Sequence, residues 1–196
     1  MAGEENKTQY VPALTSVWEA IGCIATGWAQ LEHQINHAIW WLANVSQEDG
    51  ACITAQIGSF LPRMRALIAL AHRWGCSETT IKDLNKFASE ADGVGRRRNR
   101  IIHDQWLQKD DDFTKFGRWE ITADKRLVWE VKPQTREDIL AVAHAISESI
   151  NAFKKLRAQM ADEISAAIRA QLVELQNTLP AKGPGLKDQD NAPEQP

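Results

Sequence analysis

Residues 77–105 read SETTIKDLNKFASEADGVGRRRNRIIHDQ, and apolar side chains recur along them at steps of three and four residues. This spacing predicts an amphipathic helix with one buried face. Ser77 precedes the pattern and is suited to cap the helix N-terminus. Gly93 and Gly95 weaken the middle of the helix, because glycine loses more conformational freedom on folding than other residues. The apolar stripe includes one arginine and consists of Ile81, Leu84, Phe87, Ala91, Val94, Arg98, Ile101 and Gln105.

Two helical segments are predicted before this helix. The first covers about residues 15–43 and is a long amphipathic helix. The second covers residues 53–74, where Pro62 removes a backbone donor and is expected to kink or restart the helix. Gly75 is expected to end it.

Beyond the central helix the period changes to two, which predicts a β-hairpin over about residues 106–133. Trp119 and Trp129 fall on one face of this hairpin, and we expect that face to cover the end of the helices. The segment Thr135–Asp138 resembles a capping box and opens a last helix of roughly forty residues, about 60 Å long at ~1.5 Å per residue. Because this length exceeds what the other helices need, its end is expected to pack against a second subunit.

Length and composition indicate one globular domain. The chain has 196 residues, of which 43% are hydrophobic, and a chain of this size can bury about 70% of its unfolded surface. We expect the domain to cover residues 13–178, between a flexible N-terminus at residues 1–12 and a disordered polar tail at residues 179–196. The sequence lacks a signal pattern and any run of ~20 apolar residues. It therefore predicts a soluble, cytoplasmic protein with no membrane partner.

The metal-binding residue types form no recognisable site. Cys23, Cys52 and Cys76 are odd in number and lack paired spacing, which predicts reduced, buried thiols. His33 and His37 lie one helical turn apart, but no third ligand is evident. We therefore expect neither a metal nor another cofactor.

The most informative chemistry lies at the end of the central helix, where Arg98, Asn99 and His103 place a cation, an amide and a titratable imidazole close together. On an ideal helix Asn99 and His103 share a face, whereas Arg98 and His103 differ by about 140° and ~7.5 Å of rise. One helix alone is therefore not expected to aim both inward easily. Two copies of the helix crossing at a twofold axis would let both side chains line a shared cleft, so we expect the site to need a homodimer.

These residue types suit metal-free cleavage of RNA. His103 can exchange a proton with a ribose 2′-hydroxyl or a leaving oxygen near neutral pH. Arg98 offers a planar fork of donors to a phosphate, and Asn99 can orient the phosphate or the imidazole. The net charge is −3, so attraction to nucleic acid must come from a local patch. The residues expected to supply that patch are Arg96, Arg97 and Arg100.

A structural alternative explains the same arginine without catalysis. Arg98 lies on an apolar stripe and could pair with a carboxylate, and Glu32 lies beside the stripe of the first helix. Such a pair would lock two helices together. The protein would then be a noncatalytic helical module that binds nucleotide, RNA or another protein.

The string Arg98-Asn99-Arg100-Ile101-Ile102-His103 resembles the Arg-Asn-x-x-x-His signature of the HEPN superfamily, particularly its prokaryotic members. The resemblance covers roughly residues 17–156. It implies a mainly α fold, an up-and-down four-helix bundle, with the hairpin between the third and fourth helices and the long C-terminal helix as additions. It also implies a homodimeric, metal-independent endoribonuclease that leaves a 2′,3′-cyclic phosphate. Arg98 and His103 would be the catalytic pair and Asn99 a polar modulator, in a toxin with a cognate antitoxin or a phage-defence effector.

Overall fold

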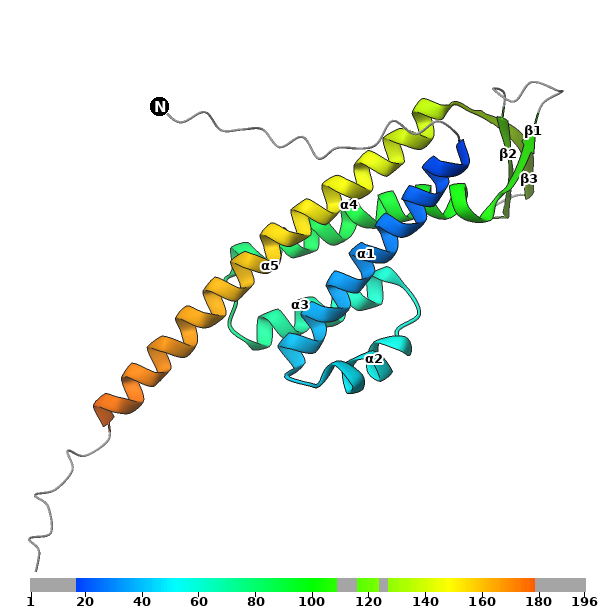
Figure 1. Cartoon of the computed structure of the whole chain (residues 1–196). Helices are drawn as coiled ribbons and strands as arrows, with labels where there is room; N and C mark the ends of the chain where they lie inside the picture. Colours follow the sequence, from blue (N-terminus) through cyan, green and yellow to red (C-terminus); the bar gives the residue numbers. More distant parts are fainter. Residues whose placement is uncertain (1–16, 109–115, 124–126, 179–196) are drawn as a thin grey trace, which may run out of the picture.

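The computed structural model describes residues 17–108, 116–123 and 127–178, and it is mainly helical (Figure 1). Within these residues there are five helices and one three-stranded antiparallel sheet. The flexible terminus expected at residues 1–12 and the tail expected at residues 179–196 lie outside the described residues. The elements in chain order are α1 (Val17–Ala43), α2 (Gln47–Ala55), α3 (Phe60–Arg73), α4 (Glu78–His103), β1 (Gln105–Gln108), β2 (Phe116–Ala123), β3 (Leu127–Gln134) and α5 (Arg136–Thr178).

The hydrophobic core lies where α1, α3, α4 and α5 pack against one another. Leu31 and Ile35 of α1 are fully buried. Phe87 of α4 faces Phe153 of α5, with ring centroids 5.5 Å apart. On α4 the predicted apolar positions from Ile81 to Ile101 are all buried. The helical periodicity therefore identified the buried face of α4 correctly.

The restart expected near Pro62 is present, but the break falls at residues 56–59, and the first of the two helices begins at Gln47 rather than at residue 53. The chain leaves α2 at Ala55 and re-enters a helix at Phe60, before Pro62. Pro62 lies in the first turn of α3, where backbone N–H groups have no partner within the helix, so its missing donor costs little. The missed start of α2 is capped by Ser46, whose hydroxyl accepts a hydrogen bond from the backbone N–H of Asp49 at 3.0 Å.

The helix that carries the motif has the predicted start and a slightly earlier end. The hydroxyl of Ser77 accepts from the backbone N–H of Thr80, and Gly75 before it has a φ of 78°, a left-handed conformation suited to glycine. The helix ends at His103 rather than at Gln105, because Asp104 is extended and the next residue already belongs to β1. The motif therefore occupies the last two turns of α4.

The predicted hairpin is confirmed as β2 and β3, with Trp119 opposite Val131. A third strand, β1, was not predicted and pairs with β2 on its other side, with Gln105 opposite Trp119. Only Asp104 separates the end of α4 from this strand. The sheet thus lies directly against the C-terminal end of α4, as Figure 1 shows.

The capping box before α5 is confirmed. The backbone N–H of Thr135 donates to the Asp138 carboxylate at 2.9 Å, and the backbone N–H of Asp138 donates to the Thr135 hydroxyl at 3.1 Å. The helix is 43 residues long, and its far end extends beyond the other helices in Figure 1. That this end packs against a second subunit stays a prediction.

One of the expectations about the cysteines is wrong. Cys76 is buried and Cys23 is half-buried, but Cys52 is exposed, because it lies on the outer side of the short helix α2. All three thiols are free. In the part of the chain that the structure describes, no helix has the length and apolarity needed to cross a membrane.

Gly95 allows α1 and α4 to approach closely. A Cβ atom at Gly95 would lie 2.8 Å from Cη2 of the buried Trp28, whereas one at Gly93 would meet only the end of Arg96 at 3.8 Å. We expect Gly95→Ala to lower the free energy of unfolding by about 1 kcal/mol or more, because overpacking outweighs the gain in helix propensity. Gly93→Ala is the control and should raise it by ~0.5–1 kcal/mol. Chemical denaturation measures both, and two variants of equal stability would contradict the close contact.

The N-terminal end of α4 is tied to α5 through a carboxylate. Ser77 donates to Glu163 through its backbone N–H at 2.8 Å and its hydroxyl at 2.9 Å, and the Thr80 hydroxyl donates at 2.7 Å. These hydrogen bonds, above all the one from Thr80, lower the pKa of Glu163. A lowered pKa in the folded state means that the carboxylate stabilises the fold at neutral pH and that this stabilisation is lost as the pH falls through the acid range.

The variant Glu163→Gln is therefore expected to be less stable than wild type at pH 7 and to lose less stability on acidification. The difference should shrink below about pH 5, since the wild-type carboxylate then takes up its proton. Thermal unfolding from pH 7 to pH 3 measures the two curves. Parallel curves over the whole range would show that Glu163 does not couple folding to pH.

Candidate functional site

The orientation of the motif follows from the buried residue within it. Ile101 is only 3% exposed, and its carbonyl accepts a hydrogen bond from Trp106 Nε1 at 2.8 Å. With Ile101 turned inward, Asn99 and His103 are exposed, whereas Arg98 is half-buried at the edge of the core face. The last two turns of α4 therefore present the polar side chains of the motif to solvent from a fixed backbone.

Among the three predicted site residues, Arg98 contacts both of the others. Arg98 Nη1 donates to Asn99 Oδ1 at 2.9 Å and lies 3.4 Å from His103 Nε2. A guanidinium can only donate, so the second contact is a hydrogen bond when Nε2 carries no proton. The arrangement leaves a cation and a potential proton acceptor side by side on an exposed surface.

Arg98 and His103 are not both directed inward, as expected, but they contact each other within one helix. The two residues differ by more than a third of a turn, but the long arginine side chain runs along the helix toward the C-terminal turn and reaches the imidazole. One copy of the chain is thus sufficient for this contact. A cleft shared between two copies stays a prediction.

Glu32 does not pair with Arg98, so the predicted structural pair is wrong. Instead, Glu32 Oε1 accepts a hydrogen bond from Nη1 of Arg63 on α3 at 3.0 Å. Arg98 forms no ion pair with any carboxylate in the described part of the chain, and its Nε atom is buried without a hydrogen-bond partner there. Arg63 could not be predicted as this partner, because the partner of a charged residue depends on how two helices meet.

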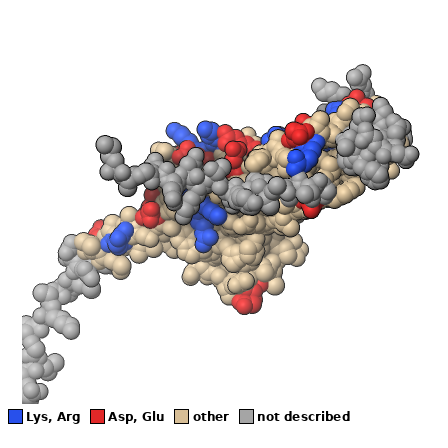
Figure 2. All heavy atoms as spheres, turned by 45° about the horizontal axis from the view of Figure 1, so that its top comes forward, with Lys and Arg blue, Asp and Glu red and all other residues tan. Residues whose placement is uncertain are grey.

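The three arginines expected to attract RNA differ in how free their charges are. Arg96 is paired with Asp92 one turn earlier. Arg100 is 3.7 Å from Asp104 and also reaches the sheet. Arg97 is exposed and forms no ion pair with a described residue. On the face of the molecule shown in Figure 2, basic and acidic side chains are interspersed, and no single large basic patch is seen there.

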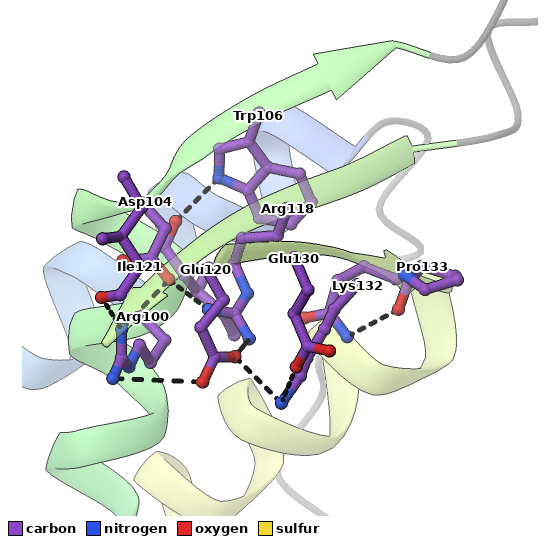
Figure 3. A network of polar contacts seen from close by, with 11 residues as sticks. Arg100, Asp104, Trp106, Arg118, Glu120, Ile121, Glu130, Lys132 and Pro133 are labelled. Atoms are coloured by element: carbon purple, nitrogen blue, oxygen red, sulfur yellow. Dashed lines mark hydrogen bonds and ion pairs between the residues drawn. The ribbon is translucent and has the colours of Figure 1, made fainter. Parts of the chain in front are cut away.

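A network of charged side chains joins the end of α4 to the sheet (Figure 3). Its central residue is Arg118 of β2, which is 7% exposed and is ion-paired with Asp104 and with Glu120, the latter at 3.2 Å. Because Asp104 directly follows His103, the ion pair restrains the residue next to the imidazole. The network therefore fixes the C-terminal end of the helix that carries the site.

Lys132 of β3 extends this network across the sheet. Its ammonium lies 3.2 Å from carboxylate oxygens of both Glu120 and Glu130. Burial tends to raise the pKa of Glu120, but the hydrogen bond from Lys132 and the charges of Lys132, Arg100 and Arg118 outweigh it and lower that pKa. Glu120 is therefore held as a carboxylate between the two strands and α4.

The sheet packs with its charged face toward α4, which is the reverse of our expectation. Trp119 lies on the opposite face together with exposed apolar side chains, which are Ile121 at 51%, Leu127 at 64% and Val131 at 53% exposure. Alternation in the sequence assigned residues to two faces correctly, but it did not reveal which face is inside. For the same reason Asp104 and Arg118 were missed as residues that support the site.

The paired histidines on α1 are close but lack further ligands. His33 Nε2 and His37 Nε2 are 2.9 Å apart. Burial, followed by the charges of His33 and Arg157, lowers the pKa of His37. No group of three or more His, Cys, Asp or Glu side chains within residues 17–108, 116–123 and 127–178 is arranged to hold a metal ion.

Comparisons with known proteins add no relative to this description. No protein-family model, no curated protein and no solved structure matches the chain.

The buried ion pair of Arg118 gives a stability prediction. We expect Arg118→Met to lower the free energy of unfolding by about 3 kcal/mol, because it leaves the carboxylates of Asp104 and Glu120 without their main partner. Lys132→Met removes a cation from the same network at a more exposed position, so its cost should be much smaller. Urea unfolding of both variants measures the difference. Equal losses would mean that Arg118 is no more important than a surface charge.

Proposed function

We propose that the chain is a metal-independent endoribonuclease of the HEPN type, which cuts RNA through attack by a ribose 2′-hydroxyl. The observation that carries the proposal is the contact between Arg98 Nη1 and His103 Nε2, 3.4 Å apart at the exposed end of α4. No described carboxylate neutralises Arg98, so its charge is free to hold a phosphate. An unpaired guanidinium beside an exposed imidazole is suited to electrostatic and acid-base catalysis on a phosphodiester.

In the proposed reaction His103 takes the proton from the 2′-hydroxyl, and the 2′ oxygen forms a bond to phosphorus. The bond from phosphorus to the 5′ oxygen breaks. That oxygen takes a proton from His103 of a second copy of the chain, whose imidazole is protonated at the start of the reaction. The products are a 2′,3′-cyclic phosphate and a free 5′-hydroxyl. Arg98 donates hydrogen bonds to the phosphoryl oxygens as negative charge grows on them, while Asn99 orients the guanidinium through its 2.9 Å hydrogen bond.

The proposal extends to the fold and the assembly. Helices α1, α3, α4 and α5 take the places of an up-and-down four-helix bundle, to which the sheet and the far end of α5 are added. Two copies pair so that their motifs face each other, which supplies the second imidazole. Exposed Ile168, Leu172 and Val173 near the end of α5 support an apolar contact between copies. Such a nuclease would act in the cytoplasm as a toxin restrained by an antitoxin, or in phage defence.

The test is cleavage of a synthetic RNA in the presence of EDTA. We expect His103→Ala to lower the cleavage rate by ~10²-fold or more, because general acid-base catalysis typically contributes 10²–10⁴-fold. The helical circular dichroism should stay unchanged, since His103 is exposed. Mass spectrometry of the wild-type products should find the 2′,3′-cyclic phosphate.

The matched control is His72→Ala. His72 is an exposed histidine at the end of α3, and its Nε2 atom lies 3.8 Å from Glu78 in the first turn of α4. Nearly the whole length of α4 therefore separates it from His103. The variant His72→Ala should keep wild-type activity. Equal rates for wild type and His103→Ala would contradict the proposed reaction, and RNA binding without any cleavage would favour a noncatalytic binding module.

A further inference from the structure

A pocket of about 280 Å³ lies directly beside the motif, between α1, the start of α3 and α4. Arg98 lines this pocket and also contacts His103, so one side chain connects the pocket to the proposed site of cleavage. The volume is just below the roughly 300–1,000 Å³ typical of small-molecule pockets, which suits a ligand part as small as one base. The pocket is also lined by Trp28, Glu32, Ser59, Phe60 and Asp92.

The pocket combines an unpaired cation with carboxylate oxygens. Glu32 and Asp92 are paired with Arg63 and Arg96 respectively, whereas Arg98 has no carboxylate partner among the described residues. A ligand that fits this lining carries a negative charge for the guanidinium and N–H donors for a carboxylate. A nucleotide has both, on its phosphate and on its base.

We propose that this pocket selects a guanine base, with Glu32 accepting hydrogen bonds from its N1–H and N2–H groups while Arg98 holds the adjoining phosphate. The inference rests on the proposed function for RNA as the substrate, and it adds the base that the site prefers.

Guanine is favoured because of its pattern of donors. Its N1–H and N2–H groups lie side by side and match the two oxygens of a carboxylate, whereas adenine, cytosine and uracil place an acceptor beside each donor on that edge. The O6 atom of guanine needs a donor next to these groups. Phe60 and Leu61, the first two residues of α3, line the same pocket, and Ser59 provides no side-chain cap for the backbone N–H groups of this first turn.

Glu32 is better placed than Asp92 to read the base. Its partner Arg63 is largely buried between α1 and α3, which fixes the carboxylate, whereas the partner of Asp92, Arg96, is mostly exposed. The bond from Arg63 goes to Oε1 and uses part of the acceptor capacity of a carboxylate, which has about four lone-pair sites. Trp28 and Phe60 pack against each other with ring centroids 5.3 Å apart and give the pocket an apolar floor.

The first experiment compares nucleotides on the unmodified protein. Isothermal titration with guanosine, inosine, adenosine and uridine 3′-monophosphates should show the tightest binding for guanosine. Inosine lacks only the 2-amino group, so it should bind about tenfold more weakly, as expected for losing a hydrogen bond to a charged group. Equal affinities for guanosine and inosine, or binding of none of the four, would overturn the inference without relying on any variant.

The second experiment assigns the preference to Glu32. Glu32→Gln should abolish the preference for guanosine over inosine, because an amide offers one acceptor and one donor. Arg63→Gln breaks the same ion pair but keeps the Glu32 carboxylate, so the preference should survive in this control. Asp92→Asn should also keep it. If Asp92→Asn removes the preference and Glu32→Gln does not, the assignment to Glu32 is wrong.

Mapping of cleavage sites separates this inference from the proposed function. Cleavage with guanine enriched at one fixed position beside the cut supports both. Cleavage without base preference, together with equal nucleotide affinities, leaves the nuclease and rejects the guanine pocket. Selective binding of guanosine 3′-monophosphate by a protein that cuts no RNA keeps the pocket and rejects the nuclease.

Discussion

Burial of Ile101 is the constraint on which the geometry of the motif depends. Its side chain sets the rotation of the last two turns of α4, so that Asn99 and His103 face solvent and Arg98 lies at the boundary of the core. The hydrogen bond from Trp106 to its carbonyl ties the following strand to the same turn. Rotating this end of the helix would expose an apolar side chain, which opposes any other arrangement of the three polar residues.

The charged network around Arg118 completes this restraint from the other side. Buried ion pairs are weak evidence for stability, since desolvation offsets much of their attraction, but they fix geometry because a displaced partner leaves an uncompensated charge. Asp104 directly follows His103 in the chain, so the ion pair that fixes its carboxylate also limits the motion of His103. The result is a sheet whose charged face is inside and whose apolar face, with Ile121 and Val131, is exposed.

Local patterns in the sequence predicted the helices and the hairpin because their signals are contained in neighbouring residues. The 3.6-residue period identified α1, α4 and α5, and the capping residues Ser77 and Thr135 marked two of their starts. Local patterns could not predict which side chains from distant elements contact each other. Glu32 was assigned to Arg98 rather than to Arg63, and the exposed face of the sheet was taken for the buried one, because periodicity shows which residues share a face and not what that face meets.

The contact between Arg98 and His103 within one helix was not expected from the sequence, and the two residues differ in how deeply they are buried. Arg98 is half-buried, so its guanidinium acts in surroundings of lower dielectric than water, where its attraction for a phosphate is stronger than at a fully exposed position. His103 is exposed to solvent. Arg98 lies three residues before the buried Ile101, and His103 lies two residues after it. The end of α4 therefore carries a half-buried cation and an exposed imidazole. The pocket beside Arg98 adjoins this boundary, because its lining includes the buried Trp28 and Phe60 as well as the exposed Asn99.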